Sequence, residues 1–184
     1  MIIAFGHQKQ VGKDTAVNTI YREYDNVIKY SLAGPLYEIC GLLNKEFFSK
    51  NYYDANPEKK SIPMSNGKTP RQFLIEVGQK MKEVCGRDCW VNLAIDCAEN
   101  IEPKHLLISD VRYREEADKL QEHGAVFFFF FRPDLRHTSD EADDDLLDWK
   151  GWDHLLVNDG TLEEFEREVI TLYDRIKAEA WWFV

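Results

Sequence analysis

The sequence has few of the features that mark membrane, secreted or nucleic-acid-binding proteins. None of its apolar runs reaches the length of about 20 residues that a membrane-spanning helix needs. No basic segment followed by an apolar one opens the chain, as a secretory signal would. The formal net charge of −10 argues against a broad nucleic-acid surface, which requires a basic face. We therefore expect a cytoplasmic protein that binds neither a membrane nor a nucleic-acid polymer.

Cysteine is also scarce, with four residues in a chain of 184. None of the four forms a Cys-x-x-Cys pair, so their spacing argues against a zinc site. Buried, reduced thiols in a cytosolic protein are the plain interpretation of Cys40, Cys85, Cys89 and Cys97. The length predicts one domain, large enough to bury a substantial core.

The segment that follows the first apolar stretch carries the strongest chemical signal. Residues 5–16 read Phe-Gly-His-Gln-Lys-Gln-Val-Gly-Lys-Asp-Thr-Ala. An apolar strand, a Gly-containing turn and a Gly-Lys pair that opens a helix are typical of a phosphate-binding P-loop. Backbone N–H groups and the helix dipole would face the phosphates in such a loop, and Lys13 would add a positive charge.

The motif departs from the usual Gly-x4-Gly-Lys-Ser/Thr pattern. His7 occupies the first glycine position, Gly6 comes one residue too early, and Asp14 stands before Thr15. The plain alternative is an ordinary strand-to-helix turn with a solvated lysine. Apolar residues at helical spacing directly after the motif favour the P-loop: Ala16, Val17, Ile20, Tyr21 and Tyr24.

Five apolar segments predict strands, and helical segments separate them. The pattern predicts an α/β fold in which a five-stranded parallel sheet is covered on both faces. The near-continuous Phe run at 126–131 favours a central strand over a ligand platform. The expected strands are residues 1–5, 27–31, 106–109, 126–131 and 155–157.

Helices are expected between these strands. Thr69 with Gln72, and Thr161 with Glu164, form capping-box patterns at the starts of two of them. The expected helices are residues 35–48, 70 onward, 90–98 and 162–178. We interpret 49–68 as a long polar loop and 134–150 as a polar insert rich in acidic residues.

Three charged residues are candidates for binding magnesium or phosphate. Asp110 ends the third expected strand and Arg112 follows it, at the sheet edge where ligands collect. An acidic residue there typically positions magnesium or water. Arg71 lies in the first turn of a helix, where the dipole also favours anions. A turn aspartate and solvated arginines are the alternatives.

A basic cluster follows the fourth expected strand. Arg132, Arg136 and His137 precede the acidic insert, as in a lid that closes over a triphosphate and excludes water. Salt bridges to nearby acids are the alternative for both arginines, and His137 is equally well explained as a polar loop residue. Trp90 fits either base stacking or core packing. The apolar tail at 181–183 favours core packing or a subunit contact, and with the latter a homodimer.

Several segments together resemble the deoxynucleoside monophosphate kinases of tailed bacteriophages, within the P-loop nucleotide kinases. Their order covers nearly the whole chain. The segments are Val-Gly-Lys-Asp-Thr-Ala at 11–16, Ser-Leu-Ala-Gly-Pro-Leu at 31–36, the helix at 71–78 with Trp-Val at 90–91, Ser-Asp-Val-Arg at 109–112 with Glu115 and Glu116, and Asn-Asp-Gly-Thr-Leu-Glu-Glu at 158–164.

The resemblance implies the P-loop NTPase three-layer fold, with an insert for the monophosphate at about 35–98 and a small lid at about 132–150. It implies ATP as phosphoryl donor, Mg²⁺, and a deoxynucleoside monophosphate acceptor, in the host cytoplasm if the chain is phage-encoded. The implied site residues are Gly12, Lys13, Asp14 and Thr15 for the ATP phosphates, Thr15 and Asp110 for magnesium, Arg71, Arg112, Asp110 and Trp90 for the acceptor, and Arg132 and Arg136 for the transferring group.

Two alternatives stay open at this point. A different small-molecule kinase, such as a dephospho-coenzyme A or nucleoside kinase, uses the same kind of loop with another acceptor. A nucleotide-binding protein without catalysis would explain the departures at His7 and Asp14. The two anion sites predicted at Arg71 and Arg112 argue against a passive binder.

Overall fold

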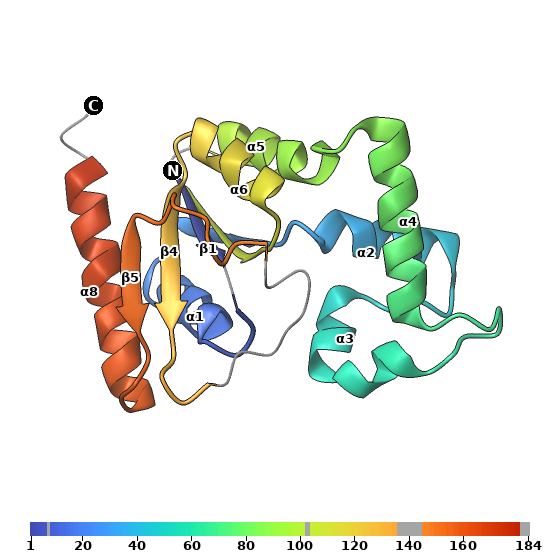
Figure 1. The fold of residues 1–184 in the computed structure, drawn as a ribbon, viewed down its shortest axis with the longest axis horizontal. Coiled ribbons are helices and arrows are strands. Elements are labelled where there is room, and N and C mark those ends of the chain that lie inside the picture. Colours follow the sequence, from blue (N-terminus) through green and yellow to red (C-terminus); the bar gives the residue numbers. More distant parts are fainter. Residues whose placement is uncertain (7, 102–103, 136–144, 181–184) are drawn as a thin grey trace. The chain divides into compact units, whose positions relative to one another are not determined.

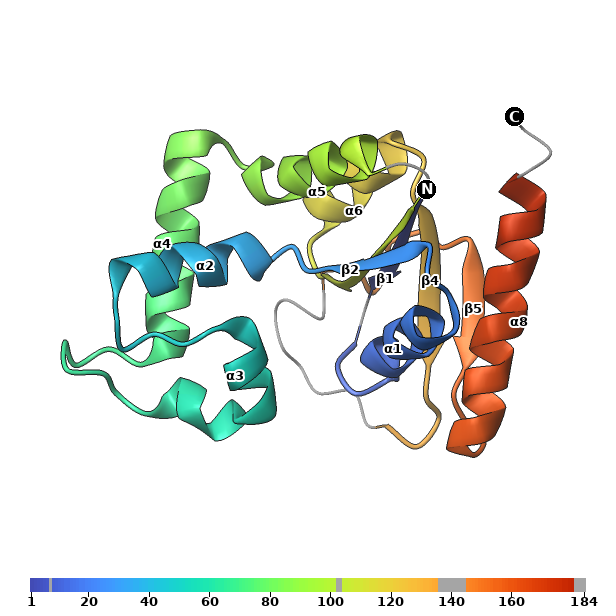
Figure 2. The same ribbon diagram turned by 180° about the vertical axis from the view of Figure 1, so that it is seen from behind.

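The computed structural model describes residues 1–6, 8–101, 104–135 and 145–180, and the chain divides into two compact units. Unit 1 comprises Met1–Tyr30 and Ile95–Val184, and unit 2 comprises Ser31–Ala94. Figures 1 and 2 show the ribbon from the two sides. No helix within the described ranges is both long and apolar enough to cross a bilayer.

Unit 1 is built on one sheet. Its five strands are ordered β2-β3-β1-β4-β5, and every neighbouring pair is parallel. The predicted five-stranded parallel sheet is therefore confirmed, with strand bounds that move by one or two residues. The strands are β1 Ile2–Gly6, β2 Val27–Tyr30, β3 His105–Val111, β4 Val126–Phe131 and β5 His154–Val157.

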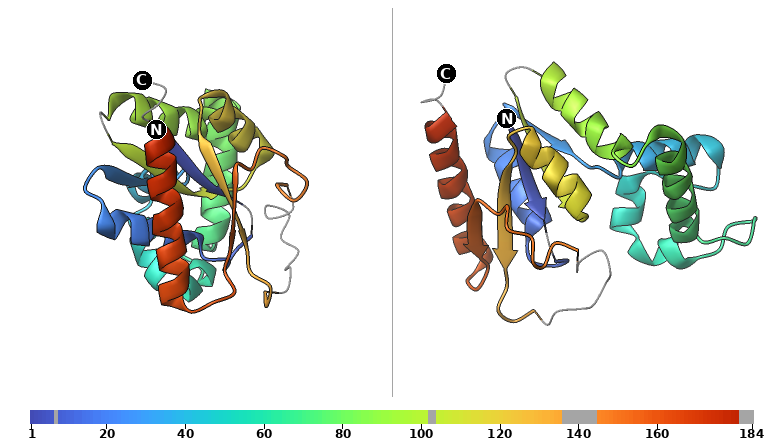
Figure 3. Two further views of the ribbon diagram at one scale, coloured as in Figure 1. Left: turned by 90° about the vertical axis from the view of Figure 1, so that its left-hand side faces the viewer. Right: turned by 45° about the horizontal axis from the view of Figure 1, so that its top comes forward.

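Helices cover both faces of this sheet, which is why its strands are apolar without alternation. Helices α1 (Lys13–Glu23) and α8 (Leu162–Ala180) pack on one face, and α6 (Arg114–Glu122) lies on the other (Figure 3). Helix α5 (Cys89–Asn100) connects the two units along the chain.

The Phe run forms β4, as predicted, between β1 and β5. Its side chains alternate between the two faces. Phe128 packs edge-on against Phe5 with ring centroids 5.1 Å apart, under α1 and α8. Phe127 packs against Trp149 on the opposite face, at 4.7 Å. Both faces of the strand are therefore occupied by aromatic core contacts.

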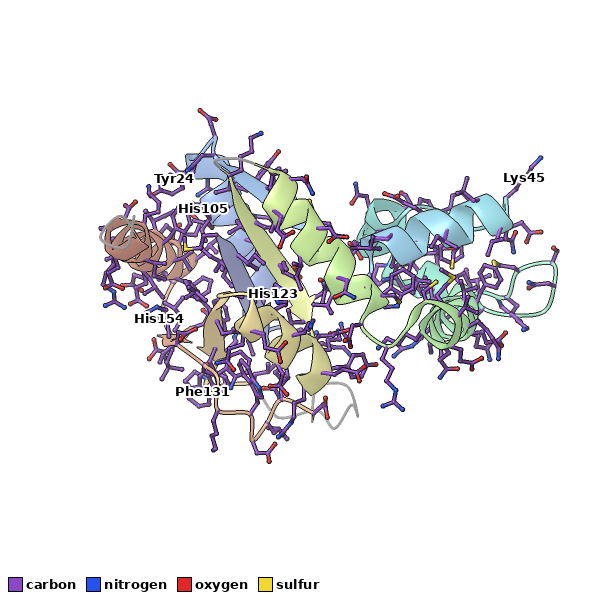
Figure 4. All side chains as sticks on the ribbon, turned by 90° about the horizontal axis from the view of Figure 1, so that it is seen from above. Tyr24, Lys45, His105, His123, Phe131 and His154 are labelled. Carbon is purple, nitrogen blue, oxygen red and sulfur yellow. The ribbon has the colours of Figure 1, made fainter. Side chains whose placement is uncertain are left out.

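Polar bonds tie α1 to α8 at the end of the sheet where β3 begins. Arg22 pairs with Glu166 at 3.1 Å, and the Tyr24 hydroxyl donates to Asp174 at 2.7 Å. His105, the first residue of β3, bonds the Tyr173 hydroxyl through Nδ1 at 2.7 Å, and Figure 4 shows His105 beside Tyr24. Burial, with a smaller effect of the N-terminal amine, lowers the pKa of His105 to about 4.

Unit 2 is helical. Its elements are α2 Gly34–Leu43, α3 Lys50–Ala55, the 3-10 helix η1 Pro57–Ser61 and α4 Pro70–Cys85. Its core is a small aromatic cluster around Tyr37, Phe47 and Tyr53, closed by Cys40 and Met64. The capping box predicted at Thr69 and Gln72 is present at the start of α4, with Pro70 in the first turn.

Three predictions about unit 2 were wrong, one of them the burial of its cysteines, since Cys40 is buried but Cys85 is exposed and Cys89 is half-buried. The helix expected to reach residue 48 ends at Leu43, because Asn44 adopts an extended backbone and its side chain accepts the N–H of Glu46. The polar loop expected at 49–68 contains α3 and η1. Ser49 caps α3 by accepting the N–H of Tyr52, and the buried Tyr53 anchors the helix in the core.

Two features of unit 1 also differ from what its sequence predicts. No helix was expected at α6, because it has few apolar residues and therefore shows no helical spacing of them. The insert at 134–150 is not polar throughout, since Leu146 is fully buried and Trp149 is 6 % exposed. The Trp149 indole donates to Asp118 on α6 at 2.7 Å, so this end of the insert packs against the sheet domain.

Candidate functional site

The loop between β1 and α1 has the backbone geometry that the motif predicts. Gly12 is the N-cap of α1 with φ 113°, a left-handed conformation that an L side chain rarely adopts. A Cβ on Gly12 would lie 2.9 Å from both the Asn158 amide nitrogen and the Phe165 ring. Both the conformation and the packing therefore require glycine here, and α1 starts directly behind it.

Lys13 bends back over the loop. Its ammonium donates to the backbone carbonyl of Gln8, across the turn that Gly12 closes. This bond places a positive charge at the mouth of the loop, next to the N-terminus of α1. The first N–H groups of a helix have no partner within the helix, so charge and dipole act together on an anion here.

Gln8 is a loop residue that the sequence analysis did not single out. It is 9 % exposed, and its amide nitrogen has no hydrogen-bond partner among the described residues. A buried amide donor without a partner is costly, and such groups recur at sites that a ligand completes. Gln10 also departs from ordinary geometry, with φ 63° in a residue that has a side chain.

Two side chains that follow strands β4 and β5 donate hydrogen bonds to backbone carbonyls of the loop. The Asn158 amide, just after β5, donates to the carbonyl of Val11 at 2.9 Å. Arg132, just after β4, donates to the carbonyl of Gln10 at 3.4 Å. Asn158 was quoted in the sequence for its resemblance to a family segment, but no role was predicted for it.

Gly6 has a packing role that its sequence position did not reveal. A Cβ on Gly6 would lie 2.5 Å from the Trp152 indole. Trp152 in turn packs against Phe129 at 5.2 Å and Trp149 at 4.9 Å. Gly6, which comes one residue too early for the motif, therefore leaves room for the Trp152 side chain to cover the end of β1.

The carboxyl end of β3 lies beside this loop. Gly6 pairs with Val111, so Asp110 and Arg112 flank the residue opposite the end of β1. The register shifts between the pairs Ala4–Ile108 and Gly6–Val111, so that Ser109 and Asp110 of β3 together lie opposite the single residue Phe5. Irregularities of this kind are over-represented next to active sites, where they redirect a side chain.

Glu116 holds the turn that follows β3. It is 8 % exposed, and one carboxylate oxygen accepts the N–H groups of Arg112 at 3.2 Å and Tyr113 at 3.3 Å. The buried carboxylate thus fixes the backbone that carries Arg112. Arg114 contacts Asp148, and its N–H donates to Asp145, so residues 145–148 are tied to the start of α6.

Unit 2 holds the remaining predicted site residues. Arg71 lies exposed in the first turn of α4, as predicted. Trp90 is 7 % exposed on α5, as the core alternative for this residue expects. A cavity of about 420 Å³ opens in unit 2 against α2 and the start of α3; its walls include Tyr37, Glu38, Phe47, Phe48 and Lys50.

Some predicted residues fall outside the described part of the chain. These are His7, Arg136, His137 and the tail at 181–184. The structure brings together the loop residues, Asp110, Arg112 and Arg132 within unit 1. Neither Gln8 nor Asn158 was recognisable from the sequence, because a single amide side chain leaves no periodic or charge pattern. Only the Asn-Asp-Gly-Thr segment after the last strand pointed near Asn158.

Comparisons with known proteins agree with this geometry. A protein of Acanthamoeba polyphaga mimivirus named "Putative deoxynucleotide monophosphate kinase" is 29 % identical over 187 residues, covering 90 % of this chain and 92 % of the relative. The dephospho-CoA kinase of Campylobacter jejuni superposes with a TM-score of 0.61 at 12 % identity, covering 97 % of this chain and 98 % of that enzyme. The second likeness supports the fold alone.

The model of the family described as deoxynucleotide monophosphate kinase matches residues 71–169. The match spans more than half of the 184 residues and takes in Arg71, Asp110, Arg112, Arg132 and Asn158. The β1–α1 loop lies before it, so its assignment rests on the loop geometry. The chain belongs to the deoxynucleotide monophosphate kinase family and is a phosphotransferase.

Proposed function

We propose that the β1–α1 loop is the ATP site of this kinase, and that the γ-phosphoryl group passes from there to a deoxynucleoside 5′-monophosphate. The observation that carries the proposal is Lys13, which lies over the loop carbonyl of Gln8 behind a left-handed Gly12. Gly12, Asp14 and Thr15 contribute the backbone of the first helical turn, where phosphates bind.

Phosphoryl transfer needs positioning and charge stabilisation more than it needs a base. Lys13 holds the outer phosphates, and Arg112 grips the acceptor phosphate from the end of β3. Glu116 supports that role because it fixes the backbone N–H of Arg112. Arg71 is proposed for the acceptor phosphate as well, whereas burial favours core packing over stacking on the acceptor base for Trp90. Arg132 and Arg136 attend the transferring group.

Mg²⁺ fits the residues at this edge of the sheet. Asp110 lies at the irregular end of β3, and Thr15 lies in the first turn of α1. A carboxylate and a hydroxyl are oxygen donors of the kind that magnesium accepts alongside phosphate and water. When bound, the ion neutralises charge on the phosphates. Asp110 and Thr15 would orient the ion.

We further propose that the chain is one P-loop kinase domain. Unit 2 and the neighbouring residues of the 35–98 segment are the monophosphate insert, and 132–150 contains the lid. Residues 145–150 form the base of that lid, since Leu146 and Trp149 are buried. A bacteriophage origin, a place in the host cytoplasm and a homodimer through the tail stay predictions.

The test is ADP release from magnesium ATP with each common deoxy- and ribonucleoside monophosphate, and with dephospho-coenzyme A. We expect release with one or more deoxynucleotides. Lys13→Ala should lower kcat/KM by about a thousandfold with the fold intact, the scale of removing one charge-stabilising group. Lys9→Ala is the matched control in the same loop.

Other outcomes would point elsewhere. Release only with dephospho-coenzyme A would move the acceptor to that class. ATP binding without acceptor-dependent release would favour a protein that binds nucleotide without catalysis. A near-normal rate in Lys13→Ala would overturn the assignment of the loop.

A further inference from the structure

Asn158 is held at both its main chain and its side chain. It is the first residue after β5, and its N–H donates to the carbonyl of Phe131 at the end of β4, at 2.7 Å. Its side-chain amide donates to the carbonyl of Val11 at 2.9 Å, from 147 residues away in the sequence. The residue therefore connects the edge of the sheet to the β1–α1 loop.

The bond to Val11 determines where one backbone donor of the loop points. In a trans peptide the C=O and N–H groups lie in one plane and point in opposite directions. The peptide that carries the Val11 carbonyl also carries the N–H of Gly12. Since Asn158 holds that carbonyl toward β5, the N–H of Gly12 must face away from β5.

Packing reinforces this orientation. Gly12 is confined by the Asn158 amide and the Phe165 ring, each 2.9 Å from the position of a Cβ. Phe165, in the first turn of α8, is itself 3 % exposed and belongs to the core of unit 1. Arg132 acts in the same way on the preceding peptide, because it bonds the carbonyl of Gln10 and so aims the N–H of Val11.

We infer that Asn158 is a positioning residue for ATP, which orients the Val11–Gly12 peptide so that the Gly12 N–H faces the phosphates. The inference rests on the proposed ATP site and adds a residue to it. Asn158 touches no reacting atom. Its amide hydrogen keeps the loop from rotating a carbonyl toward the phosphates, where the lone pairs would repel them.

The sharpest variant is Asn158→Asp, which keeps the shape of the side chain and replaces the N–H donor by an oxygen. At neutral pH the introduced carboxylate has no proton to donate to the Val11 carbonyl. The hydrogen bond that orients the Val11–Gly12 peptide is therefore lost. We expect the KM for ATP and the Kd of a non-hydrolysable ATP analogue to rise at least about tenfold. The KM for the acceptor should stay within about twofold.

The pH dependence separates orientation from general damage. As the pH falls from 7 toward 5, the introduced carboxyl of Asn158→Asp gains a proton and can again donate to the Val11 carbonyl. The Val11 carbonyl in front of the introduced carboxyl favours its protonated form, which can donate a hydrogen bond. Analogue binding by Asn158→Asp, measured relative to wild type at each pH, should therefore recover on acidification. Asn158→Ala should show the same loss without recovery.

The matched control is Asp159→Asn, an equally small change at the exposed neighbouring position. It should bind the analogue as wild type does, and all three variants should unfold within a few degrees of wild type. Wild-type affinity in Asn158→Asp at pH 7 would overturn the inference. So would equal losses for ATP and acceptor, or a binding loss that tracks a lower Tm.

Wild type tests the proposed ATP site, and Asn158→Asp tests the role of Asn158. If wild type binds no ATP analogue, the proposed site is wrong and the role of Asn158 falls with it. If wild type binds and turns over ATP while Asn158→Asp does the same, only the role of Asn158 is wrong.

Discussion

The two units hold themselves together by different means. Unit 1 depends on pairing between strands far apart in the sequence, such as β1 with β3, with α1, α8 and α6 over the two faces. Unit 2 depends on an aromatic cluster drawn from residues 37–64, without a strand in its described residues. We therefore expect the backbone of unit 1 to be the more rigid, since hydrogen-bonded strands hold a backbone at more points than ring contacts do.

The difference suits a kinase with two substrates. The β1–α1 loop, proposed here as the ATP site, is attached to the sheet through Asn158 and Arg132 as well as through β1. Unit 2 offers an exposed Arg71 and a cavity of about 420 Å³, whose walls come from short helices. We expect the ATP side to be stiff and the acceptor side to be the more adaptable of the two.

Removing a buried aromatic ring from either unit should cause the greatest loss of stability. Tyr53→Ala in unit 2 and Phe128→Ala in unit 1 each remove a fully buried aromatic side chain, with an expected loss of about 3–5 kcal/mol. Hydrogen exchange should separate them. Tyr53→Ala should expose the amides of α2 and α3 while β1 and β3 stay protected, whereas Phe128→Ala should lower protection in the sheet. Equal loss throughout after Tyr53→Ala would contradict two separately stable units.

The next change should affect the KM for one substrate and leave the KM for the other unchanged. Arg71→Ala should raise the KM for the acceptor by tenfold or more, since a charged hydrogen bond contributes about 1.5–3 kcal/mol. The KM for ATP should not change. Arg87→Ala, at another exposed arginine of unit 2, is the control and should alter neither constant. A parallel rise for ATP in Arg71→Ala would place this arginine elsewhere.

A pH-dependent effect is expected at the opposite end of the sheet. The pKa of His105 falls from 6.5 to about 4 in the fold, so between these values the unfolded chain binds the proton more readily. Stability should therefore fall as the pH drops from about 6.5 to 4, by about 2 kcal/mol after allowance for partial solvation. His105→Gln should flatten this part of the urea-unfolding profile, and the exposed His123→Gln should leave it in place. An unchanged slope in His105→Gln would remove His105 as its cause.

The smallest effect concerns backbone strain in the loop. Gln10→Gly should stabilise the protein by up to about 1 kcal/mol, because glycine accepts a φ of 63° without steric cost. Lys9→Gly, beside it but without a positive φ, should destabilise by a similar amount. The midpoints of urea unfolding measure both. A loss of stability in Gln10→Gly would show that the conformation carries no strain.

Much of unit 1 was predictable. Its strands are apolar, and capping residues mark the start of α8, where Thr161 and Glu164 exchange bonds as predicted. Unit 2 was less predictable. Asn44 ends α2 through a side-chain hydrogen bond, and Ser49 starts a new helix in a segment whose composition is that of a loop. Local polar bonds of this kind decide structure without a periodic signal.

The order of the strands along the chain, the apolar core they form and the Gly-Lys pair that opens α1 follow from the sequence alone, since these depend on local composition and spacing. Tertiary structure alone decided that Trp152 covers Gly6 and that Asn158 reaches the Val11 carbonyl. Both contacts join residues about 150 positions apart, and only the parallel pairing of β1, β4 and β5 brings such residues to one edge of a sheet.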